Sequence, residues 1–286
     1  MTQIPHDQLA KQYLEEFLTP LGTVQRQYEV PGEAKYVDIW FVPDSTVQQS
    51  LSDLGLLGRM VDGMCLIEPY RNAPSRTEVR TSLMKLLWIQ EDEQRKATQL
   101  KQPLSESELP RLWILAATVS QPLVKDLGGQ VNAGWYPGVY FLHEIFKTAI
   151  VAIDQLPMIP ETLLLRVLGR GETQRQAIEE VLSLPETAPQ RNVILQLVAS
   201  WKVRMDMGEL QDFIQREEIM AISRAFELWE QEVKNQGWQE GRQEGRQGRE
   251  VEIALNLLRE QIPLETIART TGLTIAQLQD LQSQLQ

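Results

Sequence analysis

The sequence changes character at Pro157 and Pro160. Before these prolines, short apolar runs typical of strands alternate with stretches whose apolar residues recur every three or four positions, as in helices. After them, the patterned stretches have helical spacing only. Alternating helices and strands build an α/β or α+β domain around a mixed sheet. We therefore predict a mixed sheet flanked by helices in residues 1–157, an all-helical region in 158–236 and a helical tail in 237–286.

The first part of the chain also indicates the order of its elements. An amphipathic helix is predicted in HDQLAKQYLEEFLTPLG, where apolar residues recur every four positions. Period-two alternation predicts a hairpin formed by TVQRQYEV and KYVDIWFVP, followed by a buried strand in GMCLIE. The longest helix of this part follows in RTEVRTSLMKLLWIQEDEQRKATQL, and three more strands are expected in RLWILAATVS, GVYFLHE and KTAIVAID.

The tail repeats glycine at positions 237, 241, 245 and 248, separated by Gln, Glu and Arg. This spacing places the glycines on one helical face, where two helix backbones can approach closely, although each glycine also weakens a helix. The pattern fits either a self-associating helix or a flexible linker. The end of the chain, IPLETIARTTGLTIAQLQDLQ, predicts two short helices with the outline of a helix-turn-helix, in which Arg269 is the only cation.

Composition restricts the function classes. The net charge of −11 argues against a protein that coats nucleic acid regardless of sequence, although cations can still act locally within about 8–10 Å. One Cys and two His exclude an internal disulfide and a Cys/His zinc site, so oxygen atoms must hold any metal. The residues indicate neither export nor a membrane-spanning run, and we expect a cytoplasmic protein without a membrane partner.

Three acidic elements precede the long helix. Glu15 and Glu16 lie on the first helix, Asp38 lies inside the strand YVDIWF, and Glu68 ends the apolar run CLIE. Burying an ionised carboxylate without a partner costs several kcal/mol, so such residues need a cation. Acids from two neighbouring strands and a crossing helix can supply the oxygen ligands of Mg²⁺ or Mn²⁺. A bound ion of this kind polarises a phosphodiester and activates water.

The same acids also have purely structural explanations. Glu68 can pair with Arg71 or Arg76, and Asp38 can accept hydrogen bonds from tyrosines or backbone amides, as satisfied buried acids do. Glu15 and Glu16 can simply form a solvated helix face. Both readings stay open at this point.

The order of helix, Asp-bearing hairpin, Glu-bearing strand and helix resembles the PD-(D/E)XK nuclease superfamily. The segments HDQLAKQYLEEFLTPLG, YVDIWFVP, CLIEPYRN, RLWILAATVS and TAIVAIDQLP and the Gln/Glu/Gly-rich tail look like a group of cyanobacterial proteins of uncharacterised function. That group is placed near the recombination-promoting nuclease and transposase-like branch. The resemblance covers most of the chain. It implies a restriction-endonuclease-like core, Mg²⁺-dependent hydrolysis of DNA and a link to recombination or transposition.

The resemblance also implies roles for individual residues. Asp38 matches the first acid of the superfamily motif, and Glu68 matches the acid of the (D/E)XK element. Glu15 or Glu16 matches the helix-borne acid of many members. These four residues are the candidate metal ligands.

The chain departs from the motif two residues after Glu68. Tyr70 stands where the superfamily has a lysine, and a tyrosine cannot supply the positive charge that offsets charge in the transition state. A cation displaced along the chain, either Arg71 or Lys85, is the candidate replacement. Strand alternation points Arg71 away from Glu68 unless Pro69 breaks the strand.

Two functions therefore remain. The first is a metal-dependent DNA endonuclease with Asp38 and Glu68 at its centre and Arg71 or Lys85 as the cation. The second is an inactive nuclease fold that serves as an assembly or adaptor module, self-associating or binding a protein partner through its tail.

Overall fold

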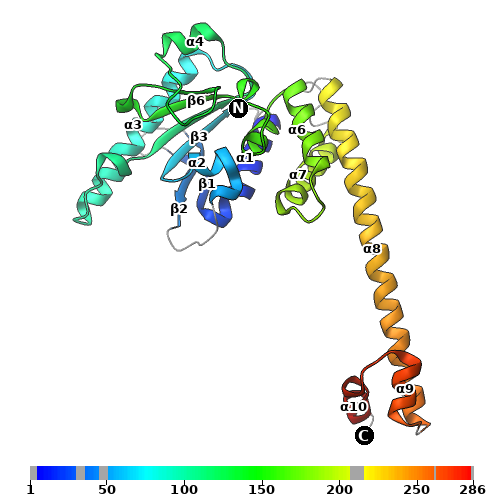
Figure 1. The fold of residues 1–286 in the computed structure, drawn as a ribbon. Helices are drawn as coiled ribbons and strands as arrows, with labels where there is room; N and C mark the ends of the chain where they lie inside the picture. The colour runs from blue at the N-terminus through cyan, green and yellow to red at the C-terminus, as the bar shows by residue number, and fades with distance from the viewer. Residues whose placement is uncertain (1–4, 30–35, 45–50, 207–215, 261, 285–286) are drawn as a thin grey trace. The chain divides into compact units, whose positions relative to one another are not determined.

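The computed structural model describes residues 5–29, 36–44, 51–206, 216–260 and 262–284, and Figure 1 shows its fold. A six-stranded mixed sheet with the order β1-β2-β3-β4-β6-β5 is flanked by helices and followed by further helices, which confirms the predicted mixed α/β architecture. The strands are β1 (Gly22–Glu29), β2 (Tyr36–Pro43), β3 (Cys65–Tyr70), β4 (Arg111–Ala116), β5 (Val139–Phe141) and β6 (Thr148–Ala152).

The helices account for most of the remaining described residues. The α-helices are α1 (Pro5–Leu18), α2 (Gly55–Met60), α3 (Arg76–Gln99), α4 (Gln121–Asp126), α5 (Leu163–Arg166), α6 (Glu172–Ser183), α7 (Pro189–Asp206), α8 (Arg216–Arg259), α9 (Leu264–Thr271) and α10 (Ile275–Gln284). Short 3₁₀ turns are η1 (Thr19–Leu21), η2 (Leu51–Leu54), η3 (Glu106–Glu108), η4 (Glu144–Phe146), η5 (Ile153–Gln155) and η6 (Pro160–Thr162).

The sheet combines an antiparallel half and a parallel half. β1 and β2 form the predicted hairpin, β2 pairs antiparallel with β3, and β3, β4 and β6 run parallel. A parallel connection needs a crossover, and α3 provides it between β3 and β4. The carboxyl ends of β3, β4 and β6 therefore lie along the same edge of the sheet, where α3 also begins.

Helix α3 begins with a capping box. The hydroxyl of Ser75 accepts the backbone N–H of Glu78 at 3.2 Å, and the carboxylate of Glu78 accepts the backbone N–H of Ser75 at 2.7 Å. Val79, Leu86 and Ile89 are buried and pack in one cluster with residues of the sheet. This apolar face determines which side of α3 packs on the sheet. It thereby also determines where the side chains between the apolar ones point.

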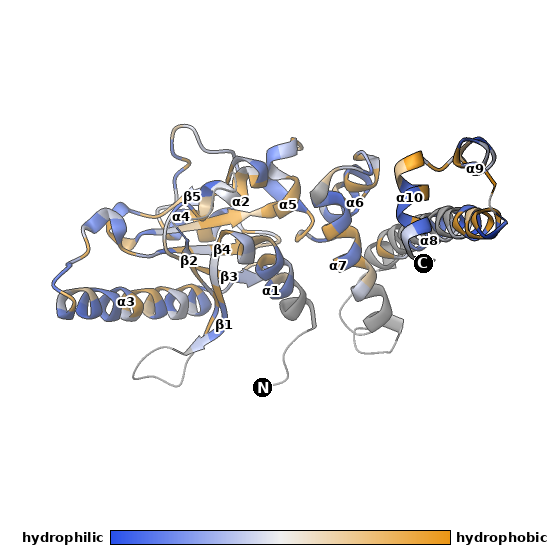
Figure 2. Ribbon diagram, turned by 90° about the horizontal axis from the view of Figure 1, so that it is seen from below, coloured by the Kyte–Doolittle hydropathy of each residue, from blue (hydrophilic) through white to orange (hydrophobic). Residues whose placement is uncertain are grey.

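The middle of the sheet is buried on both faces. Every residue of β6 is buried, as expected for a parallel strand covered by helices on both sides, and Figure 2 shows hydrophobic colours in the middle of the sheet. One face packs against α3 and α4. On the other face, the indole N–H of Trp113 donates to the carbonyl of Met60 at the end of α2, at 2.8 Å.

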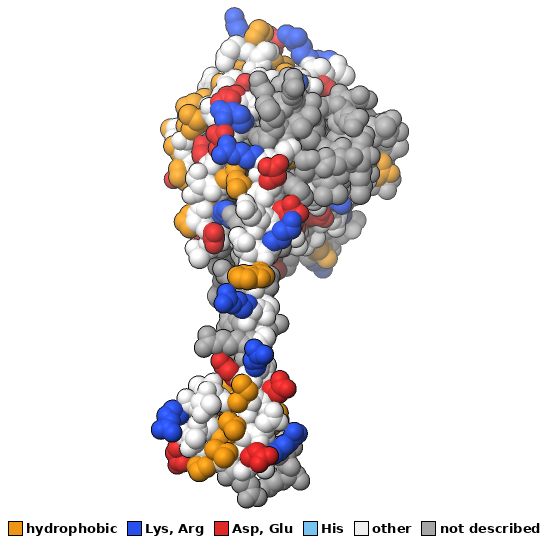
Figure 3. Space-filling view, turned by 90° about the vertical axis from the view of Figure 1, so that its right-hand side faces the viewer, with side chains coloured by type: hydrophobic (Ala, Val, Ile, Leu, Met, Phe, Trp, Pro, Cys, Tyr) orange, Lys and Arg blue, Asp and Glu red, His pale blue; other side chains and the backbone are white. Residues whose placement is uncertain are grey.

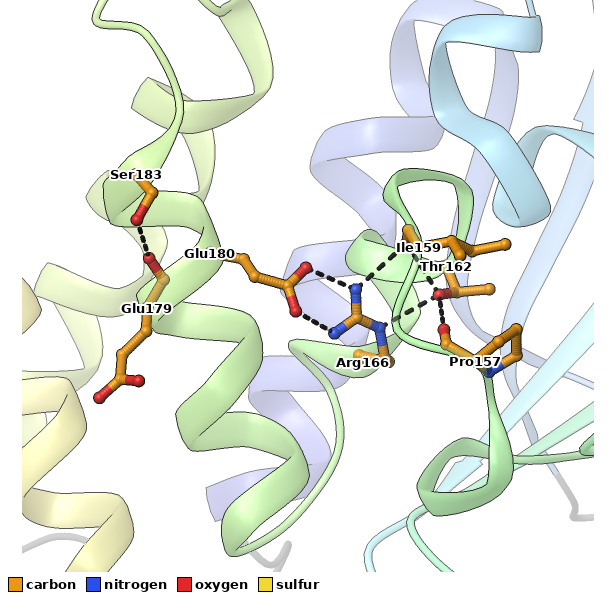
Figure 4. A network of polar contacts seen from close by, with 7 residues as sticks. All are labelled: Pro157, Ile159, Thr162, Arg166, Glu179, Glu180 and Ser183. Carbon is orange, nitrogen blue, oxygen red and sulfur yellow. Dashed lines mark hydrogen bonds and ion pairs between the residues drawn. The ribbon is translucent and has the colours of Figure 1, made fainter.

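A buried arginine connects the sheet to the helices that follow it. Arg166 of α5 is 1 % exposed and donates to both carboxylate oxygens of Glu180 of α6, at 2.7 and 2.6 Å. Its remaining donors bind the Thr162 hydroxyl and the Ile159 carbonyl, both at 3.1 Å, and Figure 4 shows this network. Its donors are thus shared between α6 and the segment that leaves the sheet, which ties the two together.

The contacts divide the chain into two compact units, Met1–Phe226 and Glu227–Gln286, whereas the sequence predicts three parts. The first unit takes in most of the predicted helical region together with the sheet. The Tyr13 hydroxyl of α1, which donates to the Leu164 carbonyl of α5 at 2.9 Å, contributes to this union. Among the described helices, none combines the length and the apolar composition that crossing a membrane requires.

The second unit consists of most of α8, from Glu227 onward, together with α9 and α10. Its small core contains Ala254, Leu258, Ile267 and Leu278. The two short helices predicted near the end of the chain are present, and Gly272 ends α9 with a φ of 77°. The glycine repeat lies within α8, so that this segment is helical rather than a flexible linker.

The contact between α2 and η2 gives a stability prediction. A Cβ added to Gly58 would lie 1.8 Å from the carbonyl oxygen of Leu51, whereas a Cβ added to Gly63 would meet nothing within 4 Å. Gly58→Ala should lower the free energy of unfolding by about 1–3 kcal/mol, although alanine is the better helix former. Gly63→Ala is the matched control and should change it by less than about 0.5 kcal/mol. Chemical denaturation measures both, and equal stability of the two variants would contradict this packing.

Candidate active site

Glu68 is a buried carboxylate held by a lysine of α3. Its side chain is 2 % exposed, and Lys85 Nζ donates to both of its carboxylate oxygens, each at 2.9 Å. The buried face of α3 directs Lys85 towards β3. An ionised carboxylate away from water requires a partner of this kind. Lys85 is therefore the predicted cation that the structure brings to Glu68.

Asp38 lies beside Glu68 on the neighbouring strand. Its backbone N–H donates to Glu68 Oε1 at 3.3 Å, just beyond the last paired residues of β2 and β3, Ile39 and Ile67. The β1–β2 register also skips Asp38 and the residue opposite, Gln27, whose φ is 53°. Irregularities of this kind redirect side chains and are frequent near functional sites.

The carboxylate of Asp38 has its own cation. Lys11 of α1 places Nζ 2.5 Å from Asp38 Oδ1. Lys11 is buried, and the side chain of Asp38 is 23 % exposed, so Asp38 is the more accessible of the two acids. Two carboxylates and two ammonium groups thus form the cluster Lys11–Asp38–Glu68–Lys85, which we call the charge cluster.

The environment of Glu68 disfavours its ionisation. Burial, followed by the negative charge of Asp38, raises the pKa of Glu68 from 4.5 to about 7. Lys85 acts in the opposite direction through its charge and its hydrogen bonds, but it does not outweigh the other two effects. A further positive charge near Asp38 and Glu68 would lower the pKa of Glu68.

Tyr70 occupies the usual lysine position and remains a hydrogen-bonding group. Its hydroxyl lies 3.0 Å from the hydroxyl of Ser82 on α3. Burial and, next in size, the charge of Glu68 raise the pKa of Tyr70 above its ordinary value of 10, so the phenol stays neutral. Ser82 and Lys85 are three residues apart on α3, so adjacent turns of one helix face contact Tyr70 and Glu68.

Other predicted site residues lie elsewhere. Glu15 pairs with Arg26 of β1 at 3.2 Å, and both side chains are largely exposed. Glu16 is exposed and lines a cavity together with Asp53 and Gln190. Helix α1 therefore contributes Lys11 to the site and not a third carboxylate, because its buried side faces Asp38. Within the described residues, no group of three or more His, Cys, Asp or Glu side chains is placed to hold a metal ion.

Arg71 follows the end of β3. Pro69 does not break this strand, since it pairs with Leu115 and Tyr70 pairs with Ala116. The cation with the largest influence on the pKa of Glu68 is Lys85. Of the two predicted cations, the structure thus favours Lys85.

Lys11 was not among the residues that the sequence indicated. It lies three and seven residues before Leu14 and Leu18, which are fully buried, and so belongs to the buried stripe of α1. A lysine inside an apolar stripe is the signal that could have identified it. Such a residue needs a buried partner, and Asp38 is that partner.

The donor set of the charge cluster fits Mg²⁺ or Mn²⁺. Mg²⁺ in proteins is held by one or two carboxylates, with waters completing its shell. Asp38 and Glu68 supply two such ligands, and burial together with the charge of Asp38 raises the pKa of Glu68. Because Lys85 binds both oxygens of Glu68, it would have to release one of them to a cation.

The raised pKa of Glu68 predicts how stability depends on pH. Since the folded-state pKa of about 7 exceeds the ordinary 4.5, the contribution of Glu68 to stability is complete below pH 4.5 and lost as the pH rises through 7. Relative to Glu68→Gln, the wild-type free energy of unfolding should therefore fall between pH 4.5 and 7, by up to about 1.4 kcal/mol per pH unit. Denaturation at a series of pH values measures this difference.

Lys85→Met provides the second arm of that experiment. Without the ammonium group, the pKa of Glu68 should rise further, and the loss of stability should extend to higher pH. A wild-type minus Glu68→Gln difference that stays constant across the range would contradict the electrostatic account of the site.

Comparisons with protein-family models, with curated proteins and with solved structures found no match to this chain. Its function is therefore inferred from its own residues.

Proposed function

We propose that the chain is a cytoplasmic, metal-dependent DNA endonuclease of the PD-(D/E)XK type. The observation that carries this proposal is the position of Lys85, whose ammonium group lies 2.9 Å from both oxygens of Glu68, beside Asp38. Asp38, Glu68 and Lys85 supply the two acids and the lysine that this reaction requires. The lysine comes from α3 instead of the position that Tyr70 occupies.

The order of the elements supports the same proposal. Helix α1, the antiparallel strands β1, β2 and β3, helix α3 and the parallel strand β4 follow each other as the resemblance implies. Asp38 lies on β2 and Glu68 on β3, in neighbouring positions of adjacent strands. A restriction-endonuclease-like core would place its acids at this point.

Asp38 and Glu68 would hold the divalent ion. When bound, the ion supplies polarisation of the phosphodiester and activation of a water molecule. The residues of the chain have complementary tasks. Lys85 offsets the negative charge that develops on the phosphate oxygens, as a preorganised cation in a water-poor site does. Lys11 holds the Asp38 side chain in place through its ion pair.

Plasmid nicking tests the proposal. In the presence of Mg²⁺ or Mn²⁺, the wild-type protein should convert supercoiled plasmid to the nicked form. Asp38→Asn, Glu68→Gln and Lys85→Met should each slow this conversion about 100-fold or more, because each removes a charge that acts on the reacting phosphate. Gel electrophoresis over time measures the rates, with thermal unfolding as a check that each variant is folded.

Three variants serve as matched controls. Glu15→Gln and Glu16→Gln remove acids that the structure places away from the charge cluster, and Arg71→Gln removes the other candidate cation. All three should nick at the wild-type rate. Equal rates for wild type, Asp38→Asn and Glu68→Gln would show that the activity does not come from this site, and the proposal would fail.

A second candidate function, that of an inactive scaffold, is supported by the equal numbers of positive and negative groups in the charge cluster. Each carboxylate already has an ammonium partner, so that the four charges cancel without a metal. A nuclease fold with this internal neutralisation can persist as an inactive scaffold. Its assembly element would be α8 and the C-terminal unit, through which the chain would self-associate or bind another protein.

The surface of the C-terminal unit is compatible with such a role. Added Cβ atoms at Gly241, Gly245 and Gly248 would meet no atom within 4 Å, so nothing described covers this face of α8. Ile253 and Ile275 are exposed. On the face that Figure 3 shows, apolar side chains of this unit form a strip with charged side chains on both sides.

The glycine face can be blocked without disturbing the fold of a single chain. If self-association uses this face, the double variant Gly241→Leu/Gly245→Leu should have a smaller mass than the wild type in light scattering, because leucine prevents close approach of two backbones. The control is Asn235→Leu, because Asn235 lies about 120° around α8 from Gly241 and about 80° from Gly245. A monomeric wild type, or equal masses for all three proteins, would exclude assembly through this face.

A further inference from the structure

Three cavities of similar size on the first unit differ in charge. Two of them, each about 470 Å³, have acidic and no basic residues in their lining: one contains Glu179 and Glu180, the other Glu16 and Asp53. The third, about 430 Å³, contains Arg76 and Arg80 and no acidic residue. In a chain with a net charge of −11, a cavity whose charged lining residues are all cations requires an explanation. We call it the arginine pocket.

Hydroxyl groups complete the lining of the arginine pocket. Ser75 and Thr77 come from the start of α3, and Ser120 comes from the segment between β4 and α4. Leu123 and the ring of Pro122 form its apolar part. The pocket is therefore built from two stretches of chain that the β3–α3–β4 crossover brings together, and not from one helix end.

The positive charge of the pocket is only partly compensated. Arg76 pairs with Asp126 of α4, and its Nε lies 2.9 Å from the carboxylate. Arg80 donates to the hydroxyl of Thr77 at 3.2 Å, and among the described residues no carboxylate forms an ion pair with it. Glu78 does not line the pocket, because its carboxylate accepts the backbone N–H of Ser75. One guanidinium charge thus remains for a ligand.

The chemistry of this lining matches a phosphate group. Guanidinium groups bind phosphate oxygens through paired hydrogen bonds, and hydroxyl groups of Ser and Thr are frequent phosphate donors in nucleic-acid complexes. A carboxylate in the lining would repel such a ligand, and the pocket has none.

The arginine pocket and the charge cluster lie on different parts of α3. Arg80 and Arg76 precede Lys85 on α3 by five and nine residues, or about 7.5 and 13.5 Å along the helix axis. They also lie about 140° and 180° around the axis from Lys85. A phosphate in the arginine pocket is therefore a different group from the phosphodiester at the charge cluster.

We propose that the arginine pocket binds a backbone phosphate of the DNA other than the phosphodiester at Glu68 and Lys85. This assignment rests on the proposed nuclease function, because the charge cluster fixes where the cleaved bond lies. Arg76 and Arg80 are positioning residues: they set where the strand lies but do not touch the reacting atoms.

DNA binding without cleavage tests the proposal. The full chain is titrated into a fluorescein-labelled 30-base-pair duplex in EDTA, and anisotropy gives Kd between 50 and 200 mM salt. Arg76→Gln/Arg80→Gln should weaken binding about fivefold to tenfold per lost contact near 100 mM salt and reduce the slope of log K against log salt by about one unit per contact. Arg175→Gln, which removes a charge from α6 that already pairs with Glu172 and Glu179, should bind as the wild type does.

A second arm uses inorganic phosphate and thermal unfolding of the same proteins. Stabilisation of the wild type by phosphate, lost in the double variant together with the DNA affinity, supports the pocket as a phosphate site on the DNA path. Stabilisation by phosphate with unchanged DNA binding would overturn the proposal in favour of a small-anion site. An unchanged DNA affinity and salt slope, or an equal loss in Arg175→Gln, would also overturn it.

Failure of the pocket and failure of the nuclease proposal give different results. DNA binding that depends on Arg76 and Arg80 but is not accompanied by nicking would support the pocket proposal and contradict the nuclease proposal. Nicking that depends on Glu68 but has the wild-type KM for DNA in Arg76→Gln/Arg80→Gln would support the nuclease proposal and contradict the pocket proposal.

Discussion

The ion pair between Glu68 and Lys85 is the interaction on which the site depends. A carboxylate that is 2 % exposed cannot stay ionised without compensation, and α3 supplies it from the face that packs on the sheet. Removing one partner of a buried pair leaves an uncompensated charge and costs about 3–5 kcal/mol in other proteins. The position of α3 on the sheet and the charge state of Glu68 are thus coupled. The capping box of Ser75 and Glu78 fixes where this helix begins and hence where Lys85 lies.

The rest of the charge cluster follows from the sheet. Adjacent strands β2 and β3 bring Asp38 next to Glu68, and the break in strand pairing at this point lets the backbone N–H of Asp38 turn to Glu68 Oε1. Helices α1 and α3 then contribute one lysine each. Such a balanced cluster can bind a cation only by loosening one of its own ion pairs. Lysine and metal compete for Glu68. An enzyme would bind the metal, and a scaffold with the same fold would keep the ion pair.

Much of the fold could be predicted from sequence patterns, because those patterns report burial. Alternation in KYVDIWFVP and the apolar run around Leu66 correspond to β2 and β3, and the periodicity of the long helix corresponds to α3. The helix α4 was not expected, since RLWILAATVS reads as one strand and only Ser120 and Pro122 mark where the chain turns into a helix. The sequence also did not predict that the first helices after the sheet belong to the same compact unit as the sheet. It depends on long-range contacts such as that between Tyr13 and Leu164.

The site was predictable to the extent that it lies on regular elements. Asp38 and Glu68 were identified from carboxylates inside strand patterns, and Lys85 from the cations of the following helix. Glu15 or Glu16 was expected as a helix-borne acid of the site, but Glu15 pairs with Arg26, and α1 contributes Lys11 instead. Apolar spacing shows which side of a helix is buried, but it does not show which polar residue beside that side reaches the site.

The most direct measurement of the central claim is a crystal structure of the full chain grown with Mn²⁺, using anomalous scattering to locate the ion. The account predicts one anomalous peak within coordination distance of an oxygen of Asp38 and an oxygen of Glu68, about 2.1–2.2 Å, with Lys85 retaining at most one oxygen of Glu68. A structure with no peak there at saturating Mn²⁺, and with Lys11 and Lys85 still on their carboxylates, would contradict it.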